Sequence, residues 1–98
     1  KQHILVIDDE EIYIHAIVGL LGKRYKIIVA LNGGDGLKIA RSDPGPDLIL
    51  LDVMMQDMGG FEVCRRLKNS PRTKHVPVIF LSALEEVENK TRGFEAGG

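Results

Sequence analysis

The sequence lacks the features that mark several large classes of protein. It has 98 residues and a single cysteine, Cys64, so no disulfide can form within the chain. No apolar run approaches the length of a membrane span. The start, Lys1-Gln2-His3 before a short apolar run, lacks the long apolar segment of a signal peptide. We therefore expect a single domain in the cytoplasm.

The charges are balanced, and this balance argues against two kinds of partner. The sequence has 13 basic and 14 acidic residues, for a formal net charge of −1. It has neither the basic excess that suits nucleic acid nor a basic amphipathic helix that suits a membrane surface. We therefore expect no direct binding to nucleic acid or to a membrane. A hydrophobic fraction of 44% is enough for one core.

Four short apolar runs predict strands, at residues 4–7, 26–31, 48–51 and 76–81. Runs this short, without a polar face, suit strands that are buried on both sides of a parallel sheet. Helix-like sequence follows each run. Each of these segments has apolar residues spaced to lie on one face of a helix. In chain order they are Ile14, Ile17, Val18 and Leu21; Leu37 and Ala40; Phe61, Cys64 and Leu67; and Leu84, Val87 and Phe94. This strict alternation predicts an α/β fold, a doubly wound parallel sheet with helices on both faces.

Polar side chains follow three of the predicted strands. Asp8 and Asp9 come after the first strand, Asp52 after the third and Ser82 after the fourth. The carboxyl ends of parallel strands meet at one edge of the sheet, where such folds bind ligands, so we expect these side chains to converge. A single Asp at a strand end often only begins a turn or caps a helix. The convergence of several is what points to function.

Converging carboxylates predict a particular chemistry. Three acids crowded together repel, and their pKa values rise unless a cation joins them. Oxygen ligands with no His or Cys beside them suit Mg²⁺, and the hydroxyl of Ser82 suits an anionic group such as phosphate. An Asp carboxylate is also a recognised nucleophile that forms an aspartyl-phosphate. The residues predict Mg²⁺-assisted phosphoryl transfer onto a carboxylate.

The same residues resemble the receiver domain of two-component response regulators, the CheY-like family. The matching motifs are ILVIDDE at residues 4–10, LDVMM at 51–55 with Gly60 beyond it, VPVIFLSA at 76–83 and GFEAG at 93–97. The resemblance implies a flavodoxin-like fold with strand order 2-1-3-4-5. It also implies that Asp52 is the phosphoacceptor, that Asp8, Asp9, Asp52 and the backbone carbonyl of Met54 hold Mg²⁺, and that Ser82 hydrogen-bonds the phosphoryl group.

The resemblance implies partners as well. The phosphoryl donor would be a phosphohistidine on a sensor histidine kinase or a phosphotransfer domain, and the signal would pass to an output domain in the same chain or to a downstream protein. In the family, the side chains two positions after the phosphoacceptor and after the hydroxyl residue tune attack by water; here these are Met54 and Leu84. Two alternatives stay open: a binding module that signals without phosphorylation, and a Mg²⁺-dependent hydrolase of phosphate esters.

The sequence departs from the family pattern in two ways. Gln56 stands where the family usually has proline, and Gly59 where it often has a polar residue. The chain stops at Gly98, before the family's fifth strand, the lysine that follows it and the last helix. We therefore expect residues 1–98 to be one receiver domain that lacks its last β-α unit. The fourth strand would then be an exposed sheet edge, able to self-associate.

Overall fold

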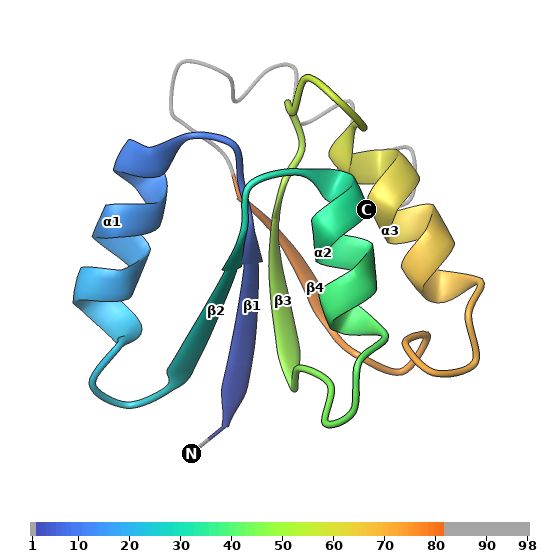
Figure 1. The fold of residues 1–98 in the computed structure, drawn as a ribbon, viewed down its shortest axis with the longest axis horizontal. Coiled ribbons are helices and arrows are strands. Elements are labelled where there is room, and N and C mark those ends of the chain that lie inside the picture. Colours follow the sequence, from blue (N-terminus) through green and yellow to red (C-terminus); the bar gives the residue numbers. More distant parts are fainter. Residues whose placement is uncertain (1, 82–98) are drawn as a thin grey trace.

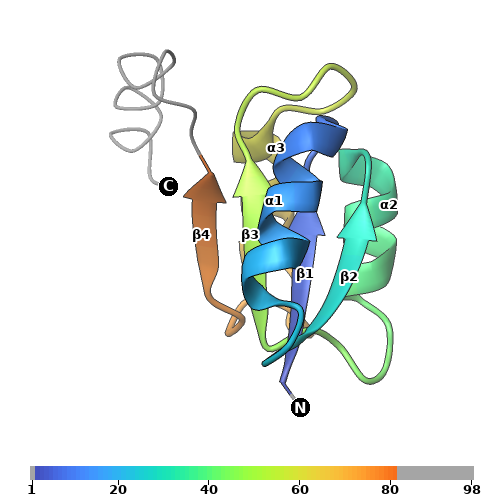
Figure 2. The same cartoon turned by 90° about the vertical axis from the view of Figure 1, so that its left-hand side faces the viewer.

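The structure, a computed structural model, describes residues 2–81. In this part of the chain four strands alternate with three helices: β1 (His3–Ile7), α1 (Glu11–Leu21), β2 (Lys26–Ala30), α2 (Gly33–Ala40), β3 (Leu48–Asp52), α3 (Gly60–Lys68) and β4 (Val78–Leu81). The strands form one parallel sheet in the order β2-β1-β3-β4, and Figure 2 shows them side by side. The predicted fold class and the first four places of the predicted strand order are confirmed. The helix predicted beyond residue 82 lies outside the described residues.

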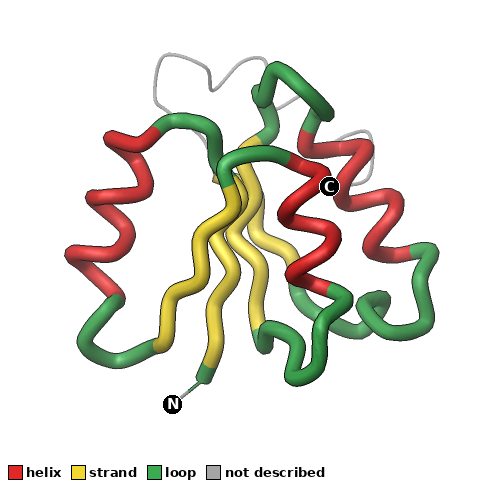
Figure 3. Tube along the Cα trace, in the orientation of Figure 1, coloured by secondary structure: helices red, strands yellow, loops and turns green. Residues whose placement is uncertain are grey.

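Helices cover both faces of the sheet, as the alternation predicted. Helix α1 lies on one face, and α2 and α3 lie on the other (Figures 1 and 3). Successive side chains of a strand point to opposite faces, so the buried strands divide the core into two clusters. The cluster under α1 contains Ile4, Val6, Ile14 and Leu50. The larger cluster includes Leu5, Ile7, Ile49 and Leu51 from the strands, with Leu37, Val63 and Leu67 from the helices.

Two glycines let the helices of the larger layer approach the strands closely. A Cβ atom at Gly36 of α2 would collide with the side chain of Ile7. A Cβ atom at Gly60, the first residue of α3, would collide with the carbonyl oxygen of Asp52. Gly60 also donates its N–H to the carbonyl of Val53, at 2.9 Å. Helix α3 therefore begins directly against the carboxyl end of β3.

Strand β4 differs from its prediction. The run at residues 76–81 forms a strand only from Val78, because Pro77 has no N–H to donate to a neighbouring strand. Phe80 is buried, and its ring meets that of Phe61 edge-on, with centroids 5.3 Å apart. Ile79, on the opposite face, is 52% exposed. The prediction that this strand is buried on both faces was therefore wrong. Ile79 lies beside Leu50, on the face of the sheet where α1 is the only helix within residues 2–81.

Candidate functional site

Strand pairing brings three acidic side chains together. In the register of β1 and β3, Ile7 pairs with Leu51, so the residues that follow, Asp8 and Asp52, are neighbours at the end of the sheet. Asp9 completes the group, and one carboxylate oxygen from each of the three residues lies within 4.8 Å of the others. The predicted convergence of Asp8, Asp9 and Asp52 is confirmed. We call these three residues the acidic cluster.

Two members of the acidic cluster are nearly buried. The exposed fraction is 2% for Asp8 and 7% for Asp52, whereas Asp9 is more exposed. Burial raises the pKa of Asp8 to about 6, because it disfavours the charged form. The N–H of Glu10 opposes this shift, while Asp52, through its charge and a hydrogen bond, and Asp9 add to it. The cluster therefore holds more negative charge than its surroundings accommodate well.

Each carboxylate of the cluster is oriented by a backbone N–H group. Asp8 accepts from the N–H of Glu10 at 2.9 Å, and Asp52 accepts from the N–H of Met54 at 3.2 Å. Asp9 accepts from the N–H of Gln56 at 3.3 Å. A carboxylate has about four acceptor positions, so these bonds orient the groups and still leave oxygen lone pairs for a ligand.

The other two predicted site residues stand differently. Met54 lies in the loop directly after β3, with a side chain that is 51% exposed. Its N–H donates to Oδ1 of Asp52, which keeps its backbone beside the cluster, and the predicted role of its carbonyl oxygen stays a prediction. Ser82 falls just after β4 and outside the described residues, so its predicted role stays a prediction.

One residue near the site was missed by the reasoning from sequence. Asp57, in the loop between β3 and α3, accepts the N–H of Gly33 at the start of α2. Desolvation raises the pKa of Asp57, but the N–H groups of Gly33, Met58 and Gly34 outweigh it and hold this pKa below its usual range. In the sequence, the Asn32-Gly33-Gly34 stretch could have indicated such a contact. The first N–H groups of a helix have no partner within the helix, and the small residues here leave them accessible to an acceptor from another segment.

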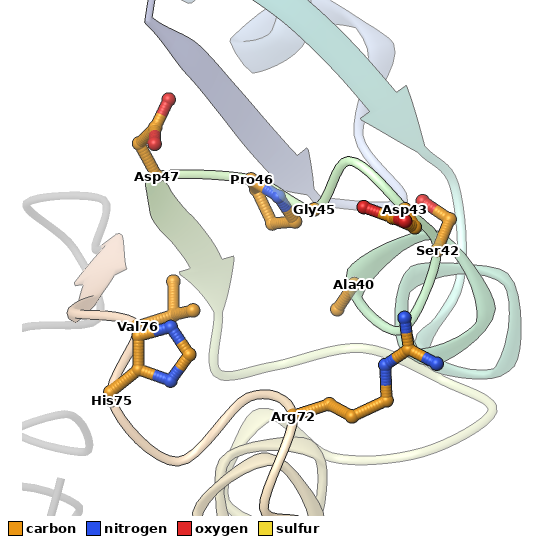
Figure 4. Close-up of a pocket in the computed structure, with 9 residues that line it drawn as sticks. All are labelled: Ala40, Ser42, Asp43, Gly45, Pro46, Asp47, Arg72, His75 and Val76. Atoms are coloured by element: carbon orange, nitrogen blue, oxygen red, sulfur yellow. The ribbon is translucent and has the colours of Figure 1, made fainter.

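A hollow of about 280 Å³ lies at the other end of the sheet and plays no part in this site. It is lined by Arg72, His75, Asp43 and Asp47 among others, and Figure 4 shows these side chains coming from the turns before β3 and β4. Asp47 already accepts the N–H of His3 at 2.8 Å. The acidic cluster, at the carboxyl ends of the strands, is therefore the candidate site.

Comparison with known proteins gives the family of the chain. The response regulator receiver domain family matches residues 4–98.

The chain belongs to the response regulator receiver domain family.

Relatives and solved structures support the assignment. This receiver domain is 42% identical over 95 residues to the response regulator PleD of Caulobacter vibrioides. The matched region covers 96% of this chain and 21% of PleD. It is 32% identical to protein PilH of Pseudomonas aeruginosa, over 96% of the chain and 78% of PilH. The structure of a response regulator receiver protein's N-terminal domain from Methanoculleus marisnigri superposes with a TM-score of 0.77 at 35% identity, covering 91% of this chain and 76% of that one. The receiver domain thus spans about a fifth of PleD.

The family places this receiver domain among signalling modules of two-component systems and not among catalytic enzymes. Receiver domains generally bind Mg²⁺ at an acidic cluster, and the donor set fits: Asp8, Asp9 and Asp52 offer hard oxygen ligands and a surplus of negative charge. Among residues 2–81, no helix is long and apolar enough to cross a membrane.

The cysteine and the histidines show no sign of chemistry. Cys64 is half-buried against the larger core cluster, and burial raises the pKa of its thiol, so it behaves as a small core residue. His3 lies on β1, His15 on α1 and His75 in the turn before β4. Within the described part of the chain, none of these histidines belongs to a group of side chains that could hold a metal ion.

Replacing Asp8 should stabilise the receiver domain in the absence of metal. The pKa of Asp8 is about 6 in the folded chain and 3.8 ordinarily. The unfolded chain therefore loses this proton more readily, and the folded state becomes less stable as pH rises from about 4 through about 6. Asp8→Asn keeps an acceptor for the N–H of Glu10 but removes this charge. At pH 7, with metal chelated, urea unfolding should show a gain on the order of 1–3 kcal/mol, which should vanish below pH 4. A variant no more stable than the parent at pH 7 would contradict this account.

Proposed function

We propose that this receiver domain accepts a phosphoryl group on Asp52 from a sensor histidine kinase or a phosphotransfer domain, with Mg²⁺ bound at the acidic cluster. The observation that carries the proposal is the meeting of three carboxylate oxygens within 4.8 Å at the ends of β1 and β3. Asp52 is the last residue of β3, an interior strand that lies between β1 and β4; it pairs with Leu81 of β4, and its carbonyl lies against Gly60 at the start of α3. That rigidity suits a nucleophile that must be aligned with an incoming phosphorus atom.

The proposed residues have separate tasks. An oxygen of Asp52 forms a bond to phosphorus as the N–P bond of the phosphohistidine breaks, and the imidazole leaves with that electron pair. Asp8, Asp9, Asp52 and the carbonyl of Met54 would hold Mg²⁺. The metal ion, when bound, offsets the negative charge of the phosphoryl oxygens and of the cluster. By resemblance, Ser82 donates a hydrogen bond to the phosphoryl group.

The proposed partners follow from the family. Receiver domains interact with histidine kinases and with output domains, and we propose that this one passes its signal to an output domain in the same chain or to a downstream protein in the cytoplasm. Phosphorylation would shift the domain between two surface states. We propose no direct contact with nucleic acid or membrane, since the charges of the whole chain nearly cancel.

Treatment with an acyl phosphate and Mg²⁺ tests the proposed chemistry. Intact mass spectrometry should show the addition of one phosphoryl group, and peptide analysis should place it on Asp52. Chelation of Mg²⁺ should suppress labelling, and Asp52→Asn should abolish it, because an amide is no nucleophile here. Absence of labelling would favour the alternative of a module that signals without phosphorylation. Sustained hydrolysis of external phosphate esters would instead favour the Mg²⁺-dependent hydrolase.

The lifetime of the phosphorylated form should depend on Met54. Its half-exposed thioether lies directly after the phosphoacceptor strand and cannot orient a water molecule strongly. Met54→Asn supplies a carboxamide that can, so release of phosphate from phosphorylated chain should become several-fold faster. Met54→Leu is the matched control and should leave the rate unchanged. An equal or slower release in the Asn variant would show that water positioning does not limit the lifetime.

We also propose that β4 mediates self-association of the 98-residue chain. Within residues 2–81 it is an edge strand, and Ile79 exposes half of its surface there. Sedimentation should show a mass above that of the monomer, rising with concentration. Ile79→Lys should restore the monomer, whereas Leu20→Lys, at an 80% exposed site on α1, should not. A monomeric parent chain at all concentrations would rule this out.

A further inference from the structure

The loop between β3 and α3 is held at one end by a contact with α2. Both carboxylate oxygens of Asp57 lie close to the backbone nitrogen of Gly33, at 3.1 and 3.3 Å. Gly33 is the first residue of α2, and the first N–H groups of a helix have no partner within it. Asp57 therefore caps a helix that lies 24 residues earlier in the sequence.

Side-chain packing strengthens the same contact. A Cβ atom at Gly33 would lie 2.8 Å from Cγ2 of Val63 and 3.0 Å from Cβ of Met58, so the start of α2 touches α3 and the residue after Asp57. Backbone N–H groups, that of Gly33 first, hold the pKa of Asp57 below its usual range, because a charged acceptor at a helix N-terminus is favourable. The loop is thus fixed to α2 both by polar contact and by close packing.

The residues just before Asp57 contact the acidic cluster. The N–H of Gln56 donates to Oδ2 of Asp9 at 3.3 Å. The N–H of Met54 donates to Oδ1 of Asp52 at 3.2 Å. Because Gln56 and Asp57 are consecutive, any movement of Asp57 away from α2 also moves the donor that orients Asp9.

We propose that Asp57 is a positioning residue for the acidic cluster, anchoring the loop to α2 so that Gln56 orients Asp9 and Met54 stays beside Asp52. This inference rests on the proposed function for its consequence, the affinity for Mg²⁺. Asp57 itself does not touch the cluster. It acts on the cluster through the two loop residues that do.

The test compares two caps of the same helix in the full chain. Asn32 also caps α2, by accepting the N–H of Asp35 at 2.8 Å, but it does not belong to the loop. Asp57→Ala and the control Asn32→Ala should both weaken the start of α2. Only Asp57→Ala should speed hydrogen exchange at the Gln56 amide, measured by NMR. Only Asp57→Ala should also weaken the affinity for Mg²⁺, by about tenfold, which is the lower end of the usual loss when a residue that supports a metal ligand is removed. Asp57→Asn should restore most of both, because its carbonyl can accept the same N–H.

Two outcomes separate this inference from the proposed function. Equal Gln56 exchange and equal Mg²⁺ affinity in Asp57→Ala and Asn32→Ala would overturn the role of Asp57. A parent chain that binds no Mg²⁺ in the titration would overturn the proposed metal site instead. In that case the exchange rate of the Gln56 amide alone decides whether Asp57 anchors the loop.

Discussion

The burial of two carboxylates at the ends of neighbouring strands is the constraint on which the rest of this structure depends. Asp8 and Asp52 are nearly inaccessible, and removing a charged group from water is costly unless something compensates it. A domain this small has little stability to spare. The two apolar clusters on either side of β1 and β3 must therefore hold both strands rigidly enough to keep the acids together against their repulsion.

Most of this arrangement could be predicted because it follows from local pattern and from parallel pairing. The runs at residues 4–7 and 48–51 have no polar face, so they had to be interior strands. Once two such strands are parallel neighbours, the residue after each lies at the same edge of the sheet. The meeting of Asp8 with Asp52 required no knowledge of side-chain contacts, and Asp9 joined them by adjacency in the sequence.

What could not be predicted depends on contacts between segments far apart in the chain. Nothing in the residues around Asp57 indicates that its acceptor oxygens face the start of α2, since that depends on how α2 packs against α3. The exposure of Ile79 was hidden for a similar reason. An apolar run indicates that a strand can be buried on both faces, but whether it is depends on which helices lie over each face.

The glutamine at residue 56 connects the local sequence pattern with the contacts between distant segments. The family usually has proline there, and proline fixes its own backbone angle but has no N–H to donate. Gln56 has that N–H and gives it to Oδ2 of Asp9. The rigidity that a proline ring would give the loop comes here from the hydrogen bond between Gln56 and Asp9. The next residue, Asp57, is held against α2 by its hydrogen bond with the N–H of Gly33. Because a carboxylate has two oxygens, Asp9 can keep this bond through Oδ2 and still present Oδ1 to a cation. Loop conformation and charge at the cluster are therefore coupled through a single side chain.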